Sequence, residues 1–174
     1  MENLDKLKET FPAAAKDIKI NLGNVLGPGH LSEAQVWGTA VACAYAARNE
    51  HLTDAVLADA RAKNIPDGTI EDARAAAVLM GMNNVLYRFR HMIDKQEYAQ
   101  KPARLRMQRL AQVASTKADF ELFCLAVSAI NNCETCVRAH EATVIEQGMT
   151  MDQVVDAVRI ASTIHAAAVA LESR

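Results

Sequence analysis

The residues best suited to chemistry in this chain are Cys133 and Cys136, followed by His140 four positions beyond the second cysteine. On a helix each residue advances about 100° around the axis, so the three side chains fall within a stripe about 60° wide. Two thiols placed this way can close into a disulfide and reopen with little backbone change, and a nearby imidazole can accept a thiol proton. The spacing therefore predicts a thiol–disulfide redox site.

The start of the helix that carries the pair favours thiolate formation. Asn131 or Asn132 is the expected N-cap, which places Cys133 in the first helical turn. Free N–H groups and the helix dipole stabilise negative charge there. Cys136 lies one turn deeper, so it gains less from the dipole and more from the histidine.

Glu121 adds a carboxylate twelve residues before Cys133, on a predicted helix over residues 120–130 that is apolar nearly all round. A lone carboxylate in such a helix is costly unless it is paired or protonated. We therefore expect Glu121 to face the cysteine pair and to act as a base. A salt bridge to Arg138 is the alternative.

The same four side chains permit other hypotheses. Inert buried thiols are one, and zinc bound by two cysteines, a histidine and a glutamate is another, which would make the chain a zinc-binding or redox-sensing interaction protein. Because no second Cys/His pair follows at finger spacing, we expect no metal. A c-type haem site would need histidine where this chain has Val137.

Composition indicates one globular domain. The 174 residues are 51% hydrophobic and 23% charged, and the formal net charge is −2, which gives no broad attraction to nucleic acid or anionic membranes. We find no signal-peptide pattern and no uninterrupted apolar stretch of about 18 residues, so we expect a cytoplasmic protein. Cys43, Cys124 and the pair do not form a disulfide scaffold. The basic run over 88–109 has few interleaved aromatics, which favours a solvated face or subunit contact over nucleic-acid binding.

Helical periodicity runs along almost the whole chain without an alternating strand pattern, so the predicted fold class is all-α. Ser32 with Gln35 and Thr150 with Gln153 form capping boxes that predict helix starts. The expected helices are one from Pro12 to Gly23, one from Ser32 to about Asn49, residues 52–63, one from Thr69 to a bend or new start at Asn83 and Asn84, residues 120–130, residues 133–146, and a last one after Thr150. On these helices Trp37, Met80, Met82 and His165 are interpreted as packing residues.

A weak internal repeat predicts two related helical halves. The order of helices and breaks over residues 34–83 recurs over 118–167, an offset of 84, although few residues match. We expect a single domain, 1–174, whose halves are about 1–110 and 111–174. The second half alone holds the cysteine pair.

The cysteine segment resembles the active-site signature of the alkyl hydroperoxidase D family, within the carboxymuconolactone decarboxylase superfamily. The resemblance extends over nearly the whole chain. It is carried by Glu121, Cys133, Cys136 and His140 with Glu141, and by the stretches Asp17-Ile-Lys-Ile-Asn-Leu22, Trp37-Gly-Thr39, Met80-Gly-Met-Asn-Asn-Val85 and Phe120-Glu-Leu122.

This resemblance implies a compact helical fold, assembly as a homotrimer and residue roles for peroxide reduction. Cys136 would be the peroxidatic cysteine, which attacks an organic hydroperoxide and becomes a sulfenic acid. Cys133 would be the resolving cysteine and proton donor, forming the Cys133–Cys136 disulfide. Glu121 and His140 would form the proton relay.

The resemblance also implies the source of electrons. No cofactor would be bound, and a dihydrolipoyl carrier protein would recharge the disulfide, ultimately from NADH through lipoamide dehydrogenase. Members of the family can also reduce a partner peroxiredoxin. Some members carry a histidine where this chain has Thr135, and a hydroxyl cannot buffer a proton near neutral pH, so turnover is expected to be lower. The runner-up enzyme is a cysteine-independent lactone decarboxylase of the same superfamily.

Overall fold

The computed structural model describes residues 1–173, and in this part of the chain every regular element is helical. The all-α prediction is confirmed. The α-helices are α1 (Glu2–Lys8), α2 (Lys16–Val25), α3 (Glu33–Ala47), α4 (Glu50–Ala62), α5 (Asp67–Ile93), α6 (Gln96–Ala99), α7 (Lys117–Ile130), α8 (Glu134–Glu146) and α9 (Met151–Glu172). Two short 3-10 turns, η1 (Ala13–Ala15) and η2 (Gln108–Ala111), precede α2 and α7.

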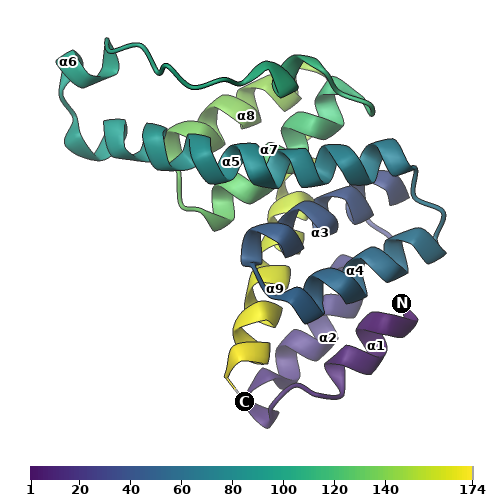
Figure 1. Ribbon diagram of the computed structural model, residues 1–174. Coiled ribbons are helices and arrows are strands. Elements are labelled where there is room, and N and C mark those ends of the chain that lie inside the picture. The colour runs from purple at the N-terminus through teal and green to yellow at the C-terminus, as the bar shows by residue number, and fades with distance from the viewer. Residues whose placement is uncertain (174) are drawn as a thin grey trace.

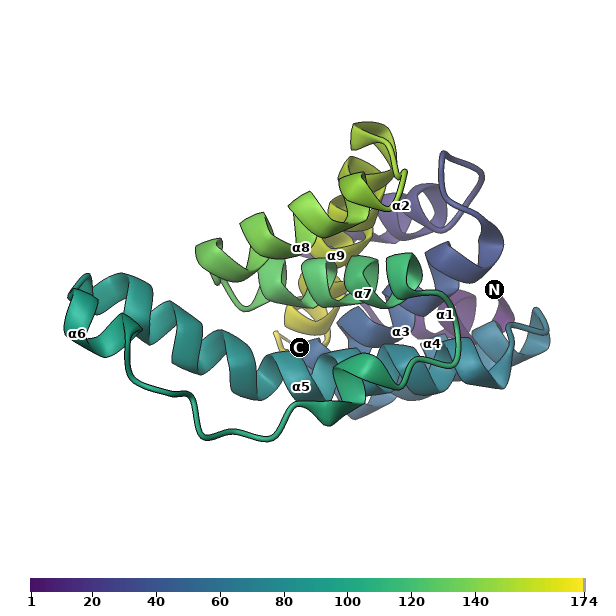
Figure 2. The same ribbon diagram turned by 90° about the horizontal axis from the view of Figure 1, so that it is seen from above.

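Two helices, α3 and α7, form the centre of the molecule. α3 and α7 pack against each other and each also packs against both α5 and α9 (Figure 2). Gly38 on α3 makes the close approach possible, since a Cβ there would lie 2.3 Å from the ring of Phe123 on α7. The largest buried side chains, Trp37, Phe120 and Phe123, all come from these two helices.

The helices of the two related halves start at equivalent positions. α3 and α7, α4 and α8, and α5 and α9 each begin 84 residues apart, which is the offset predicted from the sequence. The breaks correspond as well, because Arg48 and Asn132 both take the left-handed conformation, with φ of 59° and 54°. The helix triplets α3–α5 and α7–α9 therefore share one spacing of helix starts and breaks.

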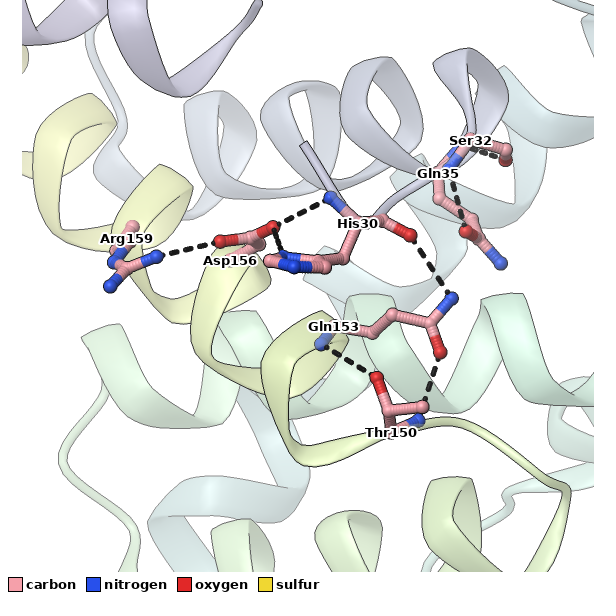
Figure 3. Close-up of polar contacts among 7 residues, drawn as sticks. All are labelled: His30, Ser32, Gln35, Thr150, Gln153, Asp156 and Arg159. Carbon is pink, nitrogen blue, oxygen red and sulfur yellow. Dashed lines mark hydrogen bonds and ion pairs between the residues drawn. The ribbon is translucent and has the colours of Figure 1, made fainter. Parts of the chain in front are cut away.

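Two aspartates at equivalent positions tie the copies together. Asp72 on α5 accepts the backbone N–H groups of Ala114 and Ser115, in the segment that leads into α7. Asp156 on α9 accepts the backbone N–H of His30, in the loop that leads into α3 (Figure 3). Each half thus anchors the entry to the other half.

The first turns of α3 and α7 also meet directly. Gln35 and Asp119 are equivalent positions, and the Gln35 side-chain amide donates to the Asp119 carboxylate at 2.8 Å. Both predicted capping boxes are confirmed, at Ser32 for α3 and at Thr150 for α9 (Figure 3). The capping boxes fix where α3 and α9 begin.

The first helix boundaries differ from the prediction. The chain begins with α1, which the sequence analysis missed, and Pro12 caps the short turn η1 rather than opening a long helix. α2 starts only at Lys16. Proline suits either a 3-10 turn or an α-helix at its start, so its presence did not distinguish the two.

The predicted break at Asn83 and Asn84 is wrong, because α5 runs without interruption to Ile93. Asparagine breaks helices when its side chain bonds to nearby backbone. Asn84 instead bonds to Ser128 on α7 and to Asn131 just after it, so its side chain does not compete with the helical hydrogen bonds.

α5 extends past the bundle, and its C-terminal end, α6 and the connection before η2 project together from one side (Figure 1). The basic run over 88–109 follows this projection. Some of its arginines bond within it, as Arg90 does to the Lys101 carbonyl, and most of its side chains are exposed.

Within residues 1–173, α9 is the helix long and apolar enough to cross a membrane by length and composition. Half of that stretch is buried inside the bundle, against α2, α3 and α7. The ion pair of Asp156 and Arg159 lies on the same helix (Figure 3). These contacts are those of a core helix.

Candidate active site

The junction of α7 and α8 positions the two cysteines. After α7 the chain turns through two asparagines, Cys133 follows as the N-cap of α8, and Cys136 lies in the first turn of that helix. A disulfide joins the two sulfurs, with the Cα atoms 5.3 Å apart. Cys133 is fully buried and Cys136 is 6% exposed, so Cys136 is the one that solvent reaches.

Cys133 itself is the N-cap of α8, so the predicted caps Asn131 and Asn132 are wrong. Asn131 is the C-cap of α7, and Asn132 takes the left-handed conformation that commonly ends a helix. Cys133 forms no side-chain capping hydrogen bond. A thiolate at this position would therefore meet unsatisfied N–H groups of α8.

Glu121 on α7 and His140 on α8 form a second pair. Glu121 Oε2 lies 2.6 Å from His140 Nδ1, and the two side chains are 17% and 15% exposed. The alternative partner Arg138 binds Glu134 instead, on the outer face of α8. This short contact between the Glu121 carboxyl group and Nδ1 fixes the orientation of the His140 ring.

The other ring nitrogen of His140 faces a thioether. His140 Nε2 lies 3.3 Å from Met80 Sδ on α5. Met80 is buried, as its interpretation as a packing residue requires, but its sulfur also contacts the imidazole. Among residues 1–173, no hydrogen bond or ion pair joins His140 or Glu121 to either cysteine sulfur. In this oxidised state the three residues of the predicted stripe separate into two groups. Cys133 and Cys136 bond to each other, and His140 pairs with Glu121.

Asn84, one turn after Met80 on α5, connects the two pairs. Its Nδ2 donates to Ser128 Oγ at 2.9 Å and to Met80 Sδ at 3.7 Å, and its Oδ1 accepts from Asn131 Nδ2 at 2.9 Å. The Ser128 carbonyl in turn accepts the backbone N–H of Cys133 at 3.1 Å. From the sequence, Asn84 is predicted only as a helix break, with no role in the site.

α5 also holds the cysteine loop from its outer side. Arg88 Nη1 donates to the Asn131 carbonyl at 2.7 Å, and His91 Nε2 lies 3.2 Å from Glu134 Oε2. The hydrogen bond from Arg138, with a smaller contribution from His91, lowers the pKa of the Glu134 carboxyl. The loop is thereby fastened to α5 on both sides of Cys133.

The other two cysteines, Cys43 and Cys124, are free and buried in α3 and α7. Burial raises the pKa of both thiols, and the nearby Glu121 charge adds to the effect at Cys124. A thiol held in its neutral form is a poor nucleophile. Thr135 is exposed on α8.

No group of three or more His, Cys, Asp and Glu side chains in residues 1–173 is arranged to hold a metal ion. The two sulfurs that the zinc hypothesis requires are bonded to each other. Metal analysis of the purified protein is the direct test of that hypothesis.

Comparison with known proteins agrees with this geometry. The family model described as "Carboxymuconolactone decarboxylase family" matches residues 96–174. The chain is 62% identical over 172 residues to the alkyl hydroperoxide reductase AhpD of Anaeromyxobacter sp. (strain K), covering 99% of this chain and 92% of that protein. Proteins of the same name from Solibacter usitatus (50% over 169 residues; 97% and 95% covered) and Rhodospirillum centenum (44% over 171 residues; 98% and 91% covered) are also similar. The chain therefore belongs to the AhpD family of the carboxymuconolactone decarboxylase superfamily.

Proposed function

We propose that this chain reduces organic hydroperoxides through a dithiol–disulfide cycle of Cys133 and Cys136. As a member of the AhpD family it is an alkyl hydroperoxide reductase. The observation that carries the mechanism is the disulfide at the start of α8, with a carboxylate–imidazole pair further along the same helix interface.

Cys136 is assigned as the peroxidatic cysteine, and its greater exposure supports that assignment. Its thiolate attacks one peroxide oxygen, the O–O bond breaks, and the departing alkoxide takes a proton to become an alcohol. Cys136 is left as a sulfenic acid. Cys133 then attacks the sulfenic sulfur, which forms the S–S bond and releases water.

Glu121 and His140 are assigned to proton transfer. Glu121 orients the ring through Nδ1, and the ring takes the Cys136 proton and returns it to the alkoxide. In the disulfide state Nε2 lies against Met80. The relay therefore operates after reduction, when the freed Cys136 side chain rotates toward the ring or a water bridges the two.

Electrons are proposed to come from a dihydrolipoyl carrier protein, ultimately from NADH through lipoamide dehydrogenase, with no cofactor held in the chain. A partner peroxiredoxin is a further electron acceptor. We also propose a cytoplasmic homotrimer. Self-association is supported by exposed apolar side chains at helical spacing along the outer face of α5, namely Val78, Val85, Phe89 and Met92.

The test is peroxide-dependent NADH consumption in the presence of lipoamide dehydrogenase and a lipoyl donor. Cys136→Ser is expected to be inactive, and Glu121→Ala is expected to be slower by about 100-fold or more, as for other lost acid–base groups. Cys43→Ala is the matched control, because it removes a free, buried thiol outside the pair, and it should keep its turnover.

Two outcomes would contradict the proposal. Unchanged activity of Cys136→Ser toward a lactone substrate, with no peroxide reduction by the wild type, would identify the decarboxylase alternative. Stoichiometric zinc in the purified protein would favour the interaction-protein alternative.

A further inference from the structure

We propose that Met80 and Asn84 are positioning residues that couple the His140 ring to the backbone carrying Cys133. The inference rests on the proposed function, because it assigns a task to residues around that site. Both side chains are 1% exposed, they lie one turn apart on α5, and α5 packs against both α7 and α8. No other element offers a polar bridge of this kind in the described chain.

The Met80 contact favours a proton on Nε2 of His140. A thioether accepts hydrogen bonds and has none to donate. Nε2 therefore bonds to Met80 Sδ only when Nε2 carries a proton. A ring without that proton would direct a lone pair at the sulfur. The geometry thus favours a ring protonated at Nε2 while the cysteines are oxidised.

A proton held on Nε2 has a use in the next step. Reduction of the disulfide by a dithiol transfers two electrons and two protons to Cys133 and Cys136, and the dithiol becomes a disulfide. The thiolate that leaves when the S–S bond breaks needs a proton. The ring of His140 is a donor within the site, and Met80 holds that proton out of solvent until the bond opens.

Asn84 connects this ring to the cysteine loop. Its amide is fully used, because both N–H groups donate, to Ser128 and Met80, and its oxygen accepts from Asn131. Ser128 and Asn131 both lie in the short segment that leads to Cys133. The Ser128 carbonyl accepts the backbone N–H of Cys133. A shift of the loop on reduction is therefore transmitted to Met80 and so to the ring.

The fold itself does not require these polar groups. The equivalent positions in the other half are Ile164 and Ala168, both buried and apolar. The partner position of Ser128 is likewise apolar, at Ala44. α5 therefore makes this bridge at the α7–α8 junction, which holds the disulfide, and α9 makes no such bridge at the equivalent α3–α4 junction among the described residues.

The first experiment reads the ring directly. In oxidised protein with ¹⁵N-labelled histidine, NMR should show a proton on His140 Nε2. Met80→Leu keeps the side-chain size but removes the acceptor, so Nε2 should lose its proton. Met82→Leu, the same change two residues away, should leave the signals unchanged. An unprotonated Nε2 in the wild type, or no change in Met80→Leu, would overturn the proposal.

The second experiment measures coupling in turnover. Met80→Leu and Asn84→Ala should each lower kcat by roughly tenfold, part of the acid–base contribution, with little change in KM. If the residues act in one chain, the double variant should be no slower than the slower single variant. Effects that multiply would contradict the coupling.

The two proposals fail in distinguishable ways. An inactive wild type would contradict the peroxidase function, whereas the NMR measurement does not depend on turnover. An active wild type with an unaffected Met80→Leu would remove only the positioning role.

Discussion

The α3–α4 and α7–α8 junctions occupy equivalent places in the two halves and use them differently. At the first junction, Asn49 caps α4 by accepting the Leu52 N–H at 2.9 Å. At the second, the equivalent residues are Cys133 and Cys136, whose side chains form a disulfide in place of a cap. The turn is required by the fold in both halves, whereas the sulfur chemistry belongs to one.

The two halves also differ at a second set of equivalent positions. Trp37 and Val56 are fully buried in the first half, at the positions that Glu121 and His140 occupy in the second. Since hydrocarbon side chains occupy these positions in the other half, packing does not explain the Glu121–His140 pair. A comparison of the halves thus separates residues that hold the fold from residues that serve chemistry.

The largest expected effects come from replacing one residue of each kind, Trp37 for the fold and Glu121 for the chemistry. Trp37→Ala should lower the free energy of unfolding by about 3–5 kcal/mol, because it empties a large buried volume. Glu121→Gln keeps shape and hydrogen bonding and should cost about 1 kcal/mol, yet slow peroxide reduction severely. Urea denaturation and turnover per folded molecule measure the two effects. Equal destabilisation by both variants would contradict the distinction between residues that hold the fold and residues that serve chemistry.

The next effect concerns the aspartates that tie the halves together. The Asp72 side chain is fully buried, whereas Asp156 is 17% exposed. Asp72→Asn is therefore expected to cost about 2 kcal/mol of unfolding free energy, for the loss of charged hydrogen bonds, and Asp156→Asn less. Denaturation at pH 7 ranks the unfolding free energies of the two variants. A larger loss in Asp156→Asn would show that burial does not determine how much each aspartate contributes to stability.

The same pair predicts acid sensitivity. Burial alone would raise the pKa of Asp72, but hydrogen bonds from Ser115, Arg109 and Ala114 outweigh it and lower the pKa below the model-peptide value of 3.8. A carboxyl whose pKa is depressed in the folded state stabilises it above that value, and the contribution is lost as the pH falls further. Wild-type stability should therefore decline below about pH 4, and Asp72→Asn should show a shallower decline between pH 5 and pH 2.

The smallest effect tests the two caps. Asn49→Ala should cost about 1 kcal/mol of unfolding free energy through loss of the α4 cap. Cys133→Asn, compared with fully reduced wild type, should gain a similar amount by supplying α8 with the cap it lacks. Thermal melts in the presence of reductant measure both, and a destabilised Cys133→Asn would mean that the thiol already acts as a cap.

Sequence reasoning succeeded where the interacting partners are close in the chain. Both capping boxes were predicted because each joins residues three apart, and the cysteine pair was found for the same reason. Asn84 was read as a helix break because its partners, Ser128 and Asn131, are 44 and 47 residues away. A side chain that leaves its own helix for a distant one gives no local signal.

The site shows the same limit. Glu121 and His140 could be singled out, because a carboxylate on an apolar helix and a histidine at helical spacing are visible in the sequence. Met80 could not, since a buried methionine in the core and one against an imidazole have the same sequence pattern. The N-cap was placed too early because asparagine is a far commoner cap than cysteine.

The hydrogen bond between Gln35 and Asp119 joins one position of the repeat to its own counterpart. That is the central contact of an isologous dimer, here enclosed within a single polypeptide. In a true dimer of identical subunits this position would have to complement itself, and any change would appear twice. Covalent union lifts that restriction, so one copy can keep an amide and the other a carboxylate. By the same freedom, one subunit-like half can remain a scaffold while the other acquires a redox centre.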